Sequence, residues 1–289
     1  MNFSRYLFHL KRATLALILV FAGEALGAEG NTLVSDGNKQ DRRILRYNLT
    51  SGTKQSIQTT TRIKVENPAL PQPMIQEQVT TLDATVKSQQ KDGSWILETL
   101  TTSPMFRQFP GFDGLRAKLR MTPSGSLEVL NLEEQIAMLS RAMGSGNEQA
   151  KQIIESMSGS SSNQSLKLPT QAVGTGATWT SKTVSSMGQF GDVVLDSRYE
   201  IKRIEGDLVE IAFTGKMDFG ELLSKVKTKQ PVKMKLTNAE IKGTYAVHLR
   251  RPQVIGTMNS LMTMELGLPN GQSGVMKMTT SVIMREVKP

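Results

Sequence analysis

The sequence predicts a mostly β protein with minor α content, built as two curved antiparallel sheets or as one incomplete barrel, with a central helical insert. Three observations support this prediction. Apolar and polar residues alternate over most of the 289 residues, as they do in half-buried strands. Short turn sequences such as Lys91–Gly93 separate the alternating segments. Between residues 131 and 157 the apolar spacing changes to that of a helix.

Residues 1–28 have the pattern of a secretory signal peptide. Three basic residues precede an apolar run at Ala13–Gly23, and small residues follow up to Ala28. A membrane-spanning helix needs about 20 apolar residues, so this run is too short to span a membrane. An uncleaved N-terminal anchor is the alternative, and Glu24 disfavours it. We expect an exported, soluble protein, periplasmic or extracellular, with no membrane span after signal cleavage.

The N-terminal β half is expected over residues 43–130, after a polar flexible leader at 29–42. Its first strand is predicted at Leu45–Leu49. The later strands follow the same alternation, and turns or a proline-rich loop at 67–73 separate them. They are expected at residues 57–65, 82–86, 95–99, 115–122 and 126–130.

A helical insert is expected at 131–157. Asn131 and Glu134 have the spacing of a capping box, in which the Asn side chain caps the helix and the Glu side chain reaches back. Helical spacing runs to Met143 and resumes at Ala150, which predicts a helical hairpin or a kinked helix packed on a sheet. A Ser/Gly-rich linker at 158–170 follows and is the best domain boundary.

The C-terminal β half is expected over residues 171–289. Its predicted strands are 179–186, 193–204, 208–216, 232–237, 242–250, 258–266 and 275–287. Lys118–Leu130 and Val232–Leu249 both have the pattern of a strand, a polar turn and a strand. This similarity suggests an internal duplication, and chance similarity between two meanders is the alternative.

Three sequence elements resemble a known group of proteins. They are R-Y-N-L at residues 46–49, T-P-S-G-S-L-E-V-L at 122–130 and V-G-T-G-A-T-W at 173–179. The chain resembles a bacterial family of exported proteins of unknown function, mostly β with a helical insert and often lipoproteins. The resemblance implies the fold and the compartment, and it implies no catalytic residue. This chain has no cysteine, so the lipid anchor of such lipoproteins is not expected here.

The composition excludes several kinds of chemistry. Without cysteine there is no disulfide, thiolate zinc site, iron–sulfur cluster or cysteine nucleophile. Of the two histidines, His9 lies in the expected signal peptide, and His248 has no serine or acid motif near it. Asp83 and Asp196 are a conceivable pair of catalytic carboxylates, but both fit better as solvent-facing or edge residues. We therefore expect no enzyme activity, no cofactor and no metal.

The methionines are more informative. On two predicted neighbouring strands they all occupy even-numbered positions, which places them on one face of each strand. They are Met258, Met262, Met264, Met276, Met278 and Met284. This face is either a core packed under the helices or an adaptable apolar surface for a lipid, acyl chain or hydrophobic peptide. Copper(I) binding by the thioethers is disfavoured because no His or Cys lies beside them.

The positive charge is concentrated in one segment, although the chain as a whole carries a formal charge of +9. Its lysines are Lys225, Lys227, Lys229, Lys233 and Lys235. An extended segment would place them on one side, whereas a short helix ending near Lys229 is equally compatible. They form either a solvated sheet edge or a contact for an anionic envelope surface. Nucleic acid is not expected, because no aromatic residues lie between the lysines.

Together these features predict an exported, non-enzymatic envelope protein that binds or carries a hydrophobic ligand on a methionine-lined β face. The alternative is a structural or protein-interaction module whose sheets are fully packed and bind no small ligand.

Overall fold

A computed structural model describes residues 29–67, 71–104, 106, 112–144, 150, 166–186, 192–219, 233–267 and 273–288. Over these residues the protein is mostly β, as predicted. The expected signal peptide at 1–28 and the segment 220–232, which holds Lys225, Lys227 and Lys229, lie outside the described residues. None of the described helices is long and apolar enough to cross a membrane.

The described strands form one large antiparallel sheet of 12 strands and one small sheet of two. In order across the large sheet, the strands are β1 (Glu29–Ser35), β9 (Thr178–Ser186), β10 (Asp192–Glu205), β11 (Leu208–Asp218), β12 (Lys233–His248), β13 (Ile255–Gly267), β14 (Ser273–Val287), β3 (Lys54–Glu66), β4 (Met74–Gln89), β5 (Trp95–Thr102), β6 (Leu115–Met121) and β7 (Leu127–Val129). The small sheet pairs β2 (Arg43–Ile44) with β8 (Ala172–Val173).

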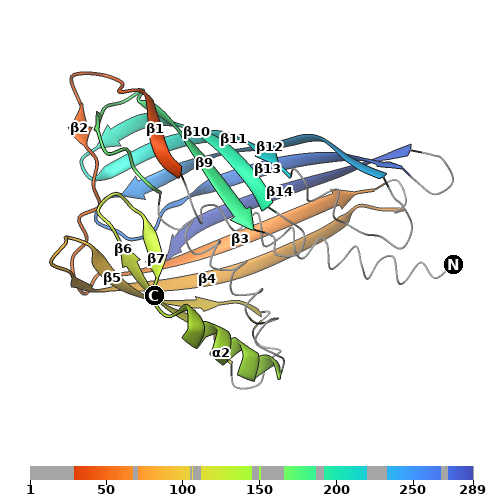
Figure 1. The fold of residues 1–289 in the computed structure, drawn as a ribbon, viewed down its shortest axis with the longest axis horizontal. Helices are drawn as coiled ribbons and strands as arrows, with labels where there is room; N and C mark the ends of the chain where they lie inside the picture. Colours follow the sequence, from red (N-terminus) through yellow and green to blue (C-terminus); the bar gives the residue numbers. More distant parts are fainter. Residues whose placement is uncertain are drawn as a thin grey trace.

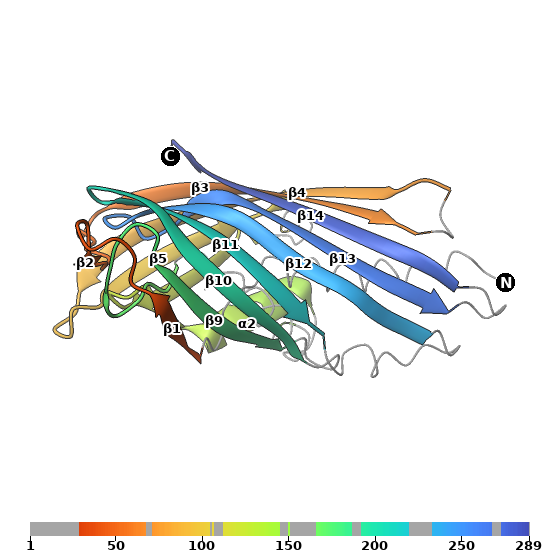
Figure 2. The same ribbon diagram turned by 90° about the horizontal axis from the view of Figure 1, so that it is seen from above.

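The pairing of β14 with β3 joins the two halves of the chain in a single sheet. The sheet bends along its width (Figure 1, Figure 2). Strands β9–β12 and strands β4–β6 therefore face each other across its inner face. Its end strands, β1 and β7, are not paired with each other, so the described sheet does not close into a barrel.

The inner face is apolar because alternate residues of each strand point toward it. Cross-strand partners such as Ile201 and Ile211, or Val209 and Val247, are buried together. Burial of each such aliphatic side chain stabilises the fold by about 1.5–3 kcal/mol. One continuous core cluster includes residues from most strands of the large sheet.

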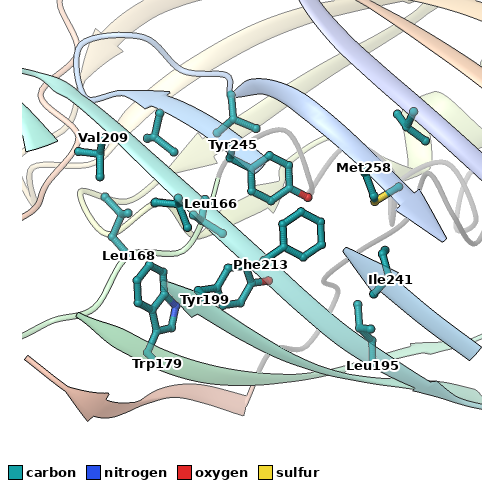
Figure 3. Close-up of a cluster of buried hydrophobic side chains, with 14 of the residues drawn as sticks. Leu166, Leu168, Trp179, Leu195, Tyr199, Val209, Phe213, Ile241, Tyr245 and Met258 are labelled. Carbon is teal, nitrogen blue, oxygen red and sulfur yellow. The ribbon is translucent and has the colours of Figure 1, made fainter. Parts of the chain in front are cut away.

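A series of aromatic rings runs across four neighbouring strands of this inner face (Figure 3). The ring centroids of Trp179 and Tyr199 are 5.2 Å apart, those of Tyr199 and Phe213 are 5.9 Å apart, and those of Phe213 and Tyr245 are 4.7 Å apart. All three pairs are stacked, so each of β9, β10, β11 and β12 contributes one ring to the series. Gly243 lies opposite Phe213 on β12, where a side chain would meet the ring.

The strand predicted at Leu45–Leu49 is wrong. These residues follow β2 without joining a ladder, although Leu45, Tyr47 and Leu49 are all buried. The Tyr47 amide donates to the Pro123 carbonyl at 2.8 Å, and the Asn48 amide donates to the Leu249 carbonyl at 2.7 Å. The backbone therefore bonds to two separate loops, and the alternation reflects burial without a strand partner.

The leader predicted as flexible at 29–42 is also different in the structure. Its first part is β1, which pairs with β9 far along the chain. Further on, the Asn38 amide donates to the Thr175 carbonyl at 2.8 Å, and the Asp41 carboxylate accepts from the Thr175 amide and hydroxyl. The Thr175 hydroxyl lowers the pKa of Asp41. This segment is therefore tied to the loop that leads into β9.

Residues 232–250 were expected to form two strands with a turn between them, and this prediction is wrong. Residues 233–248 form the single strand β12, which pairs with β13 from Lys233 to Ala246. A register shift between Leu236 and Asn238 absorbs the residues that resembled a turn. One of the strand–turn–strand units that suggested a duplication is thus absent, and the duplication stays a prediction.

The helix α2 (Leu132–Met143) begins where predicted but is capped differently. The Asn131 Oδ1 atom accepts from the Lys118 amide of β6 at 2.8 Å, so it makes no capping bond to its own helix. The helix ends at Gly144, whose φ of 58° is left-handed. Ala150 apart, the second helical stretch predicted at 150–157 lies outside the described residues.

The helix packs in a second, smaller core. Ile136 and Leu139 of α2 pack with Leu115 of β6 and with two phenylalanines. The rings of Phe106 and Phe112 meet edge to face, with centroids 5.2 Å apart. In the described residues, α2 thus covers the end of the sheet near β6.

Candidate functional site

The strands β13 and β14 bring six methionines to the inner face of the sheet. Met262 lies directly opposite Met278, and Met264 lies opposite Met276. Met258 faces Val282, and Met284 faces Gly256. We call this surface the methionine face, and its members are Met258, Met262, Met264, Met276, Met278 and Met284.

The methionine face is contiguous with the aromatic series. Figure 3 shows Met258 beyond Phe213, on the side of the ring away from Trp179. The exposed fractions of Met262 and Met278 are 1% and 3%, so the centre of the face is buried. Met276 and Met284 are only partly buried. The face is thus buried at its centre and more open at two of its corners.

Two hydroxyl groups lie in the middle of this face. Ser260 and Thr280 are cross-strand partners, 3% and 1% exposed. The next pair of residues on this face, on the side of the aromatic series, is Met258 and Val282. On the opposite side, the next pair on this face is Met262 and Met278. Neither hydroxyl has a hydrogen-bond partner among the described residues. Leaving such a group buried and unpaired costs about 1–3 kcal/mol.

The next strands on either side place aliphatic residues beside the two hydroxyls. Ile241 of β12 faces Ser260, and Ile63 of β3 faces Thr280. Charged residues of β13 and β14, such as Glu265 and Lys277, are exposed. They lie on the outer face, because successive side chains of a strand point to opposite faces. In the described register, the hydroxyl pair therefore has apolar, uncharged neighbours.

The helix α2 and the methionine face belong to different cores. The apolar side of α2 packs with Phe106, Phe112 and Leu115, whereas the buried methionines of β13 and β14 belong to the large cluster of the sheet. The described helical residues thus pack away from the face.

Only part of the predicted lysine stripe can be placed. Lys233 and Lys235 lie on β12, and Lys235 is exposed. Glu265 of β13 is its cross-strand partner, so an acidic side chain neighbours this end of the stripe. The contact with an anionic surface stays a prediction.

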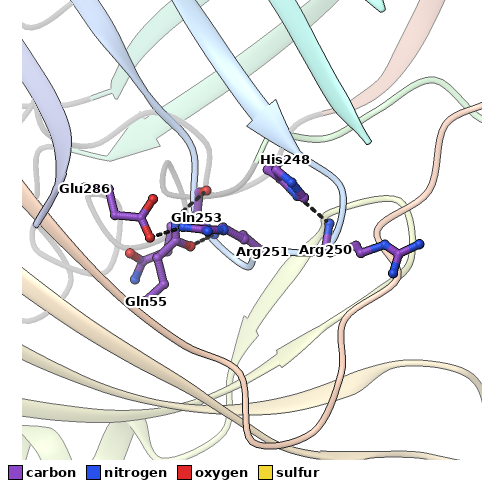
Figure 4. Close-up of polar contacts among 6 residues, drawn as sticks. All are labelled: Gln55, His248, Arg250, Arg251, Gln253 and Glu286. Carbon is purple, nitrogen blue, oxygen red and sulfur yellow. Dashed lines mark hydrogen bonds and ion pairs between the residues drawn. The ribbon is translucent and has the colours of Figure 1, made fainter. Parts of the chain in front are cut away.

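His248 ends β12 beside a cluster of polar residues (Figure 4). Its Nδ1 atom accepts from the backbone amide of Arg250 at 3.2 Å. Nearby, Arg251 forms an ion pair with Glu286. The histidine is partly exposed, and this hydrogen bond holds the local turn.

The two aspartates considered as a catalytic pair lie far apart in the sheet. Asp83 is on β4, where it accepts a hydrogen bond from the Ser56 hydroxyl. Asp196 is exposed on β10, with Lys182 and Lys216 as its cross-strand partners. Five strands separate β10 from β4 in the order of the sheet. In the described part of the chain, no group of three or more histidines or carboxylates is arranged to hold a metal ion.

The alternation of the sequence predicts the methionine face, whereas the two hydroxyls of Ser260 and Thr280 are not predicted as part of it. Their even numbers place them on the same face, so the alternation already carried that signal. Burial and missing partners could not be read from the alternation, because both depend on the strands that flank β13 and β14.

No curated protein matches the chain. A family model described as a family of unknown function, DUF6263, matches residues 74–250. The matched segment contains all four rings of the aromatic series and ends before β13. Since the match covers more than half of the 289 residues, the chain belongs to DUF6263, a family of unknown function.

Proposed function

We propose that this is an exported, non-enzymatic envelope protein that binds or carries a hydrophobic ligand on the methionine face. The ligand would be a lipid, an acyl chain or a hydrophobic peptide. One observation carries the proposal: two neighbouring strands present six methionines on one face, around two buried hydroxyls that have no hydrogen-bond partner among the described residues.

The choice of side chain supports binding over simple packing. Elsewhere on the same inner face, the core consists mainly of aliphatic and aromatic residues such as Ile201, Ile211 and Val209, with Met121 and Met217 also buried there. Methionine has three rotatable bonds and a polarizable sulfur, so a methionine surface adapts to ligands of different shapes. A face that only had to be packed would gain more from the branched residues used next to it.

The compartment is inferred from the sequence. The basic residues, apolar run and small residues of segment 1–28 support export, and cleavage after Ala28 would leave a mature chain beginning at Glu29. The lysines at 225–235 would favour contact with anionic lipid headgroups or acidic polysaccharide. The intact mass of the protein from the periplasm or the medium tests the cleavage directly.

The competing function is a packed interaction module that takes up no ligand, and the low exposure of Met262 and Met278 favours it. Native mass spectrometry of the exported protein separates the two. A carrier retains lipid when it is purified, and after lipid removal its Tm rises when phospholipid or fatty acid is added. Without retained lipid and without a Tm shift, the carrier proposal would be wrong and the packed module correct.

A pair of variants assigns the retained lipid to the face. Met262→Gln places a polar side chain in the centre of the methionine face, while Leu261→Gln makes a similar change on the exposed outer face of the same strand. We expect less retained lipid in the first variant and an unchanged amount in the second. Equal amounts in both would place the lipid elsewhere.

A further inference from the structure

We infer that the ligand of the methionine face is a neutral acyl ester whose carbonyl oxygen accepts hydrogen bonds from the hydroxyls of Ser260 and Thr280. This inference rests on the proposed function, and it names the chemistry of the ligand. It starts from two side chains that a purely apolar ligand would leave unexplained.

The position of the two hydroxyls supports a ligand contact. Ser260 and Thr280 are cross-strand partners, so their Cβ atoms lie about 5 Å apart and one acceptor atom can be reached from both. They are 3% and 1% exposed and have no partner among the described residues. Buried hydroxyl groups are nearly always hydrogen-bonded in folded proteins, and each of these two can donate to an acceptor on a bound molecule.

The surroundings indicate where the rest of the ligand lies. Met262 and Met278 follow on one side of the hydroxyl pair, and Met258 follows on the other. A polar atom in the middle with flexible apolar side chains on both sides matches a long hydrocarbon interrupted by a carbonyl group. An ester within an acyl lipid has this arrangement.

The charge of the surroundings distinguishes an ester from a carboxylate. The neighbours of the hydroxyl pair in the described register are Ile241 and Ile63, together with the methionines and Val282. None of them is charged, and a carboxylate without a cationic partner is strongly disfavoured in a buried position. A neutral ester carbonyl needs only the two donors.

A displacement experiment tests this directly. The lipid-free protein is loaded with the neutral fluorescent probe N-phenyl-1-naphthylamine, which is then displaced with heptadecane, methyl palmitate or palmitate at neutral pH. We expect methyl palmitate to compete about tenfold better than heptadecane, since hydrogen bonds of ordinary strength amount to about that factor. Palmitate should compete less well than its methyl ester.

Substitution identifies the two donors. The double variant Ser260→Ala/Thr280→Val should bind heptadecane as before and lose the preference for the ester. The matched control Thr279→Val changes the next residue of β14, which is exposed on the outer face, and should keep the preference. The double variant should fold with an unchanged or higher Tm, because it removes two buried hydroxyls that have no partner in the described part of the chain.

The outcomes separate this inference from the proposed function. Equal competition by heptadecane and the ester in the unaltered protein, a preference that survives in the double variant, or stronger competition by palmitate would overturn the inference and leave hydrophobic binding intact. A protein that binds neither the probe nor any of the three compounds would overturn the proposed function and this inference with it.

Discussion

One added methyl group at Gly243 is expected to destabilise the sheet where the aromatic series meets the methionine face. Gly243 lies on β12 between Phe213 of β11 and Met258 of β13 in the register. A Cβ atom there would lie 2.2 Å from the Thr257 carbonyl oxygen and 2.6 Å from Cε1 of Phe213. The closest contact is with the backbone of β13, so rotation of a side chain alone does not relieve it. Alanine at position 243 would therefore push β12 and β13 apart.

The size of the effect follows from the nature of the contact. Overpacking in a core costs about 1–3 kcal/mol, and we expect Gly243→Ala at the upper end because a backbone must move. For a chain of this length, a loss of about 3 kcal/mol lowers Tm by roughly 6–10 °C. Thermal unfolding followed by circular dichroism, together with urea unfolding, measures both quantities.

Gly215→Ala is the matched control on the neighbouring strand. The nearest atoms to its added Cβ are Cγ2 of Ile241 at 2.9 Å, Cδ1 of Leu195 at 3.0 Å and the Asp196 carbonyl oxygen at 3.1 Å, so its backbone contact is much longer than the 2.2 Å contact at Gly243. Alanine is also favoured over glycine in a strand by about 0.5–1 kcal/mol, so the net change should be close to zero. If Gly243→Ala is no worse than Gly215→Ala, or if Phe213→Leu fully restores its stability, the argument from the backbone contact is refuted.

Three other substitutions give distinct results. Asp41→Asn should reduce the fall in the free energy of unfolding as the pH becomes acidic. Because the Thr175 hydroxyl holds the pKa of Asp41 below its usual 3.8, the stabilisation is present above that pH and is lost as the pH falls through the lowered pKa; an unchanged acid limb in urea unfolding would contradict this. Asn131→Ala should cost about 1 kcal/mol in urea unfolding, since the Lys118 amide loses its acceptor; unchanged stability would mean that water replaces the side chain. Phe213→Ala should cost about 3–5 kcal/mol and weaken the near-ultraviolet circular dichroism of the stacked rings; an intact spectrum would show that the rings are not coupled.

Most strands could be predicted because their inner faces are regular. Alternation identifies β9, β10, β11, β13 and β14 to within three residues at each end, since each has one buried face and one solvated face. Two strands differ more: β4 runs from Met74 to Gln89 although only 82–86 is predicted, and in β12 Asn238 follows a threonine and resembles a turn. Pairing with β13 on one side keeps the strand extended, and the bulge at this residue absorbs the irregularity. The sequence around Asn238 gives no sign of this pairing, because the partner residues of β13 lie further along the chain.

The N-terminal segment shows the same limit over a longer distance. Residues 29–42 are polar and short of alternation, yet β1 pairs with β9 and Asp41 bonds to Thr175. Leu45–Leu49 alternates, yet its amides bond to two loops. In both cases the partner lies far along the chain, so the outcome depends on tertiary contacts that override local pattern.

The candidate site could be predicted in composition but not in its polar detail. Even numbering was enough to place the methionines on one face. The flanking residues Ile63 and Ile241 come from strands that precede and follow the helical segment, respectively, and only the single sheet brings them to Thr280 and Ser260. The lack of a hydrogen-bond partner is a property of that arrangement.

The inner face of the sheet is divided into two kinds of surface, and the division bears on where function lies. Across β9–β12 it is fixed by complementary shapes, with four stacked rings and a glycine beneath one of them. Across β13 and β14 it is made of flexible thioethers around two hydroxyls that no described residue hydrogen-bonds. A rigid, close-packed surface resists change in volume, whereas methionines repack around different shapes. The aromatic part is therefore the rigid part of the inner face, and under the proposed function the adjoining methionine face is the part that adjusts to a ligand.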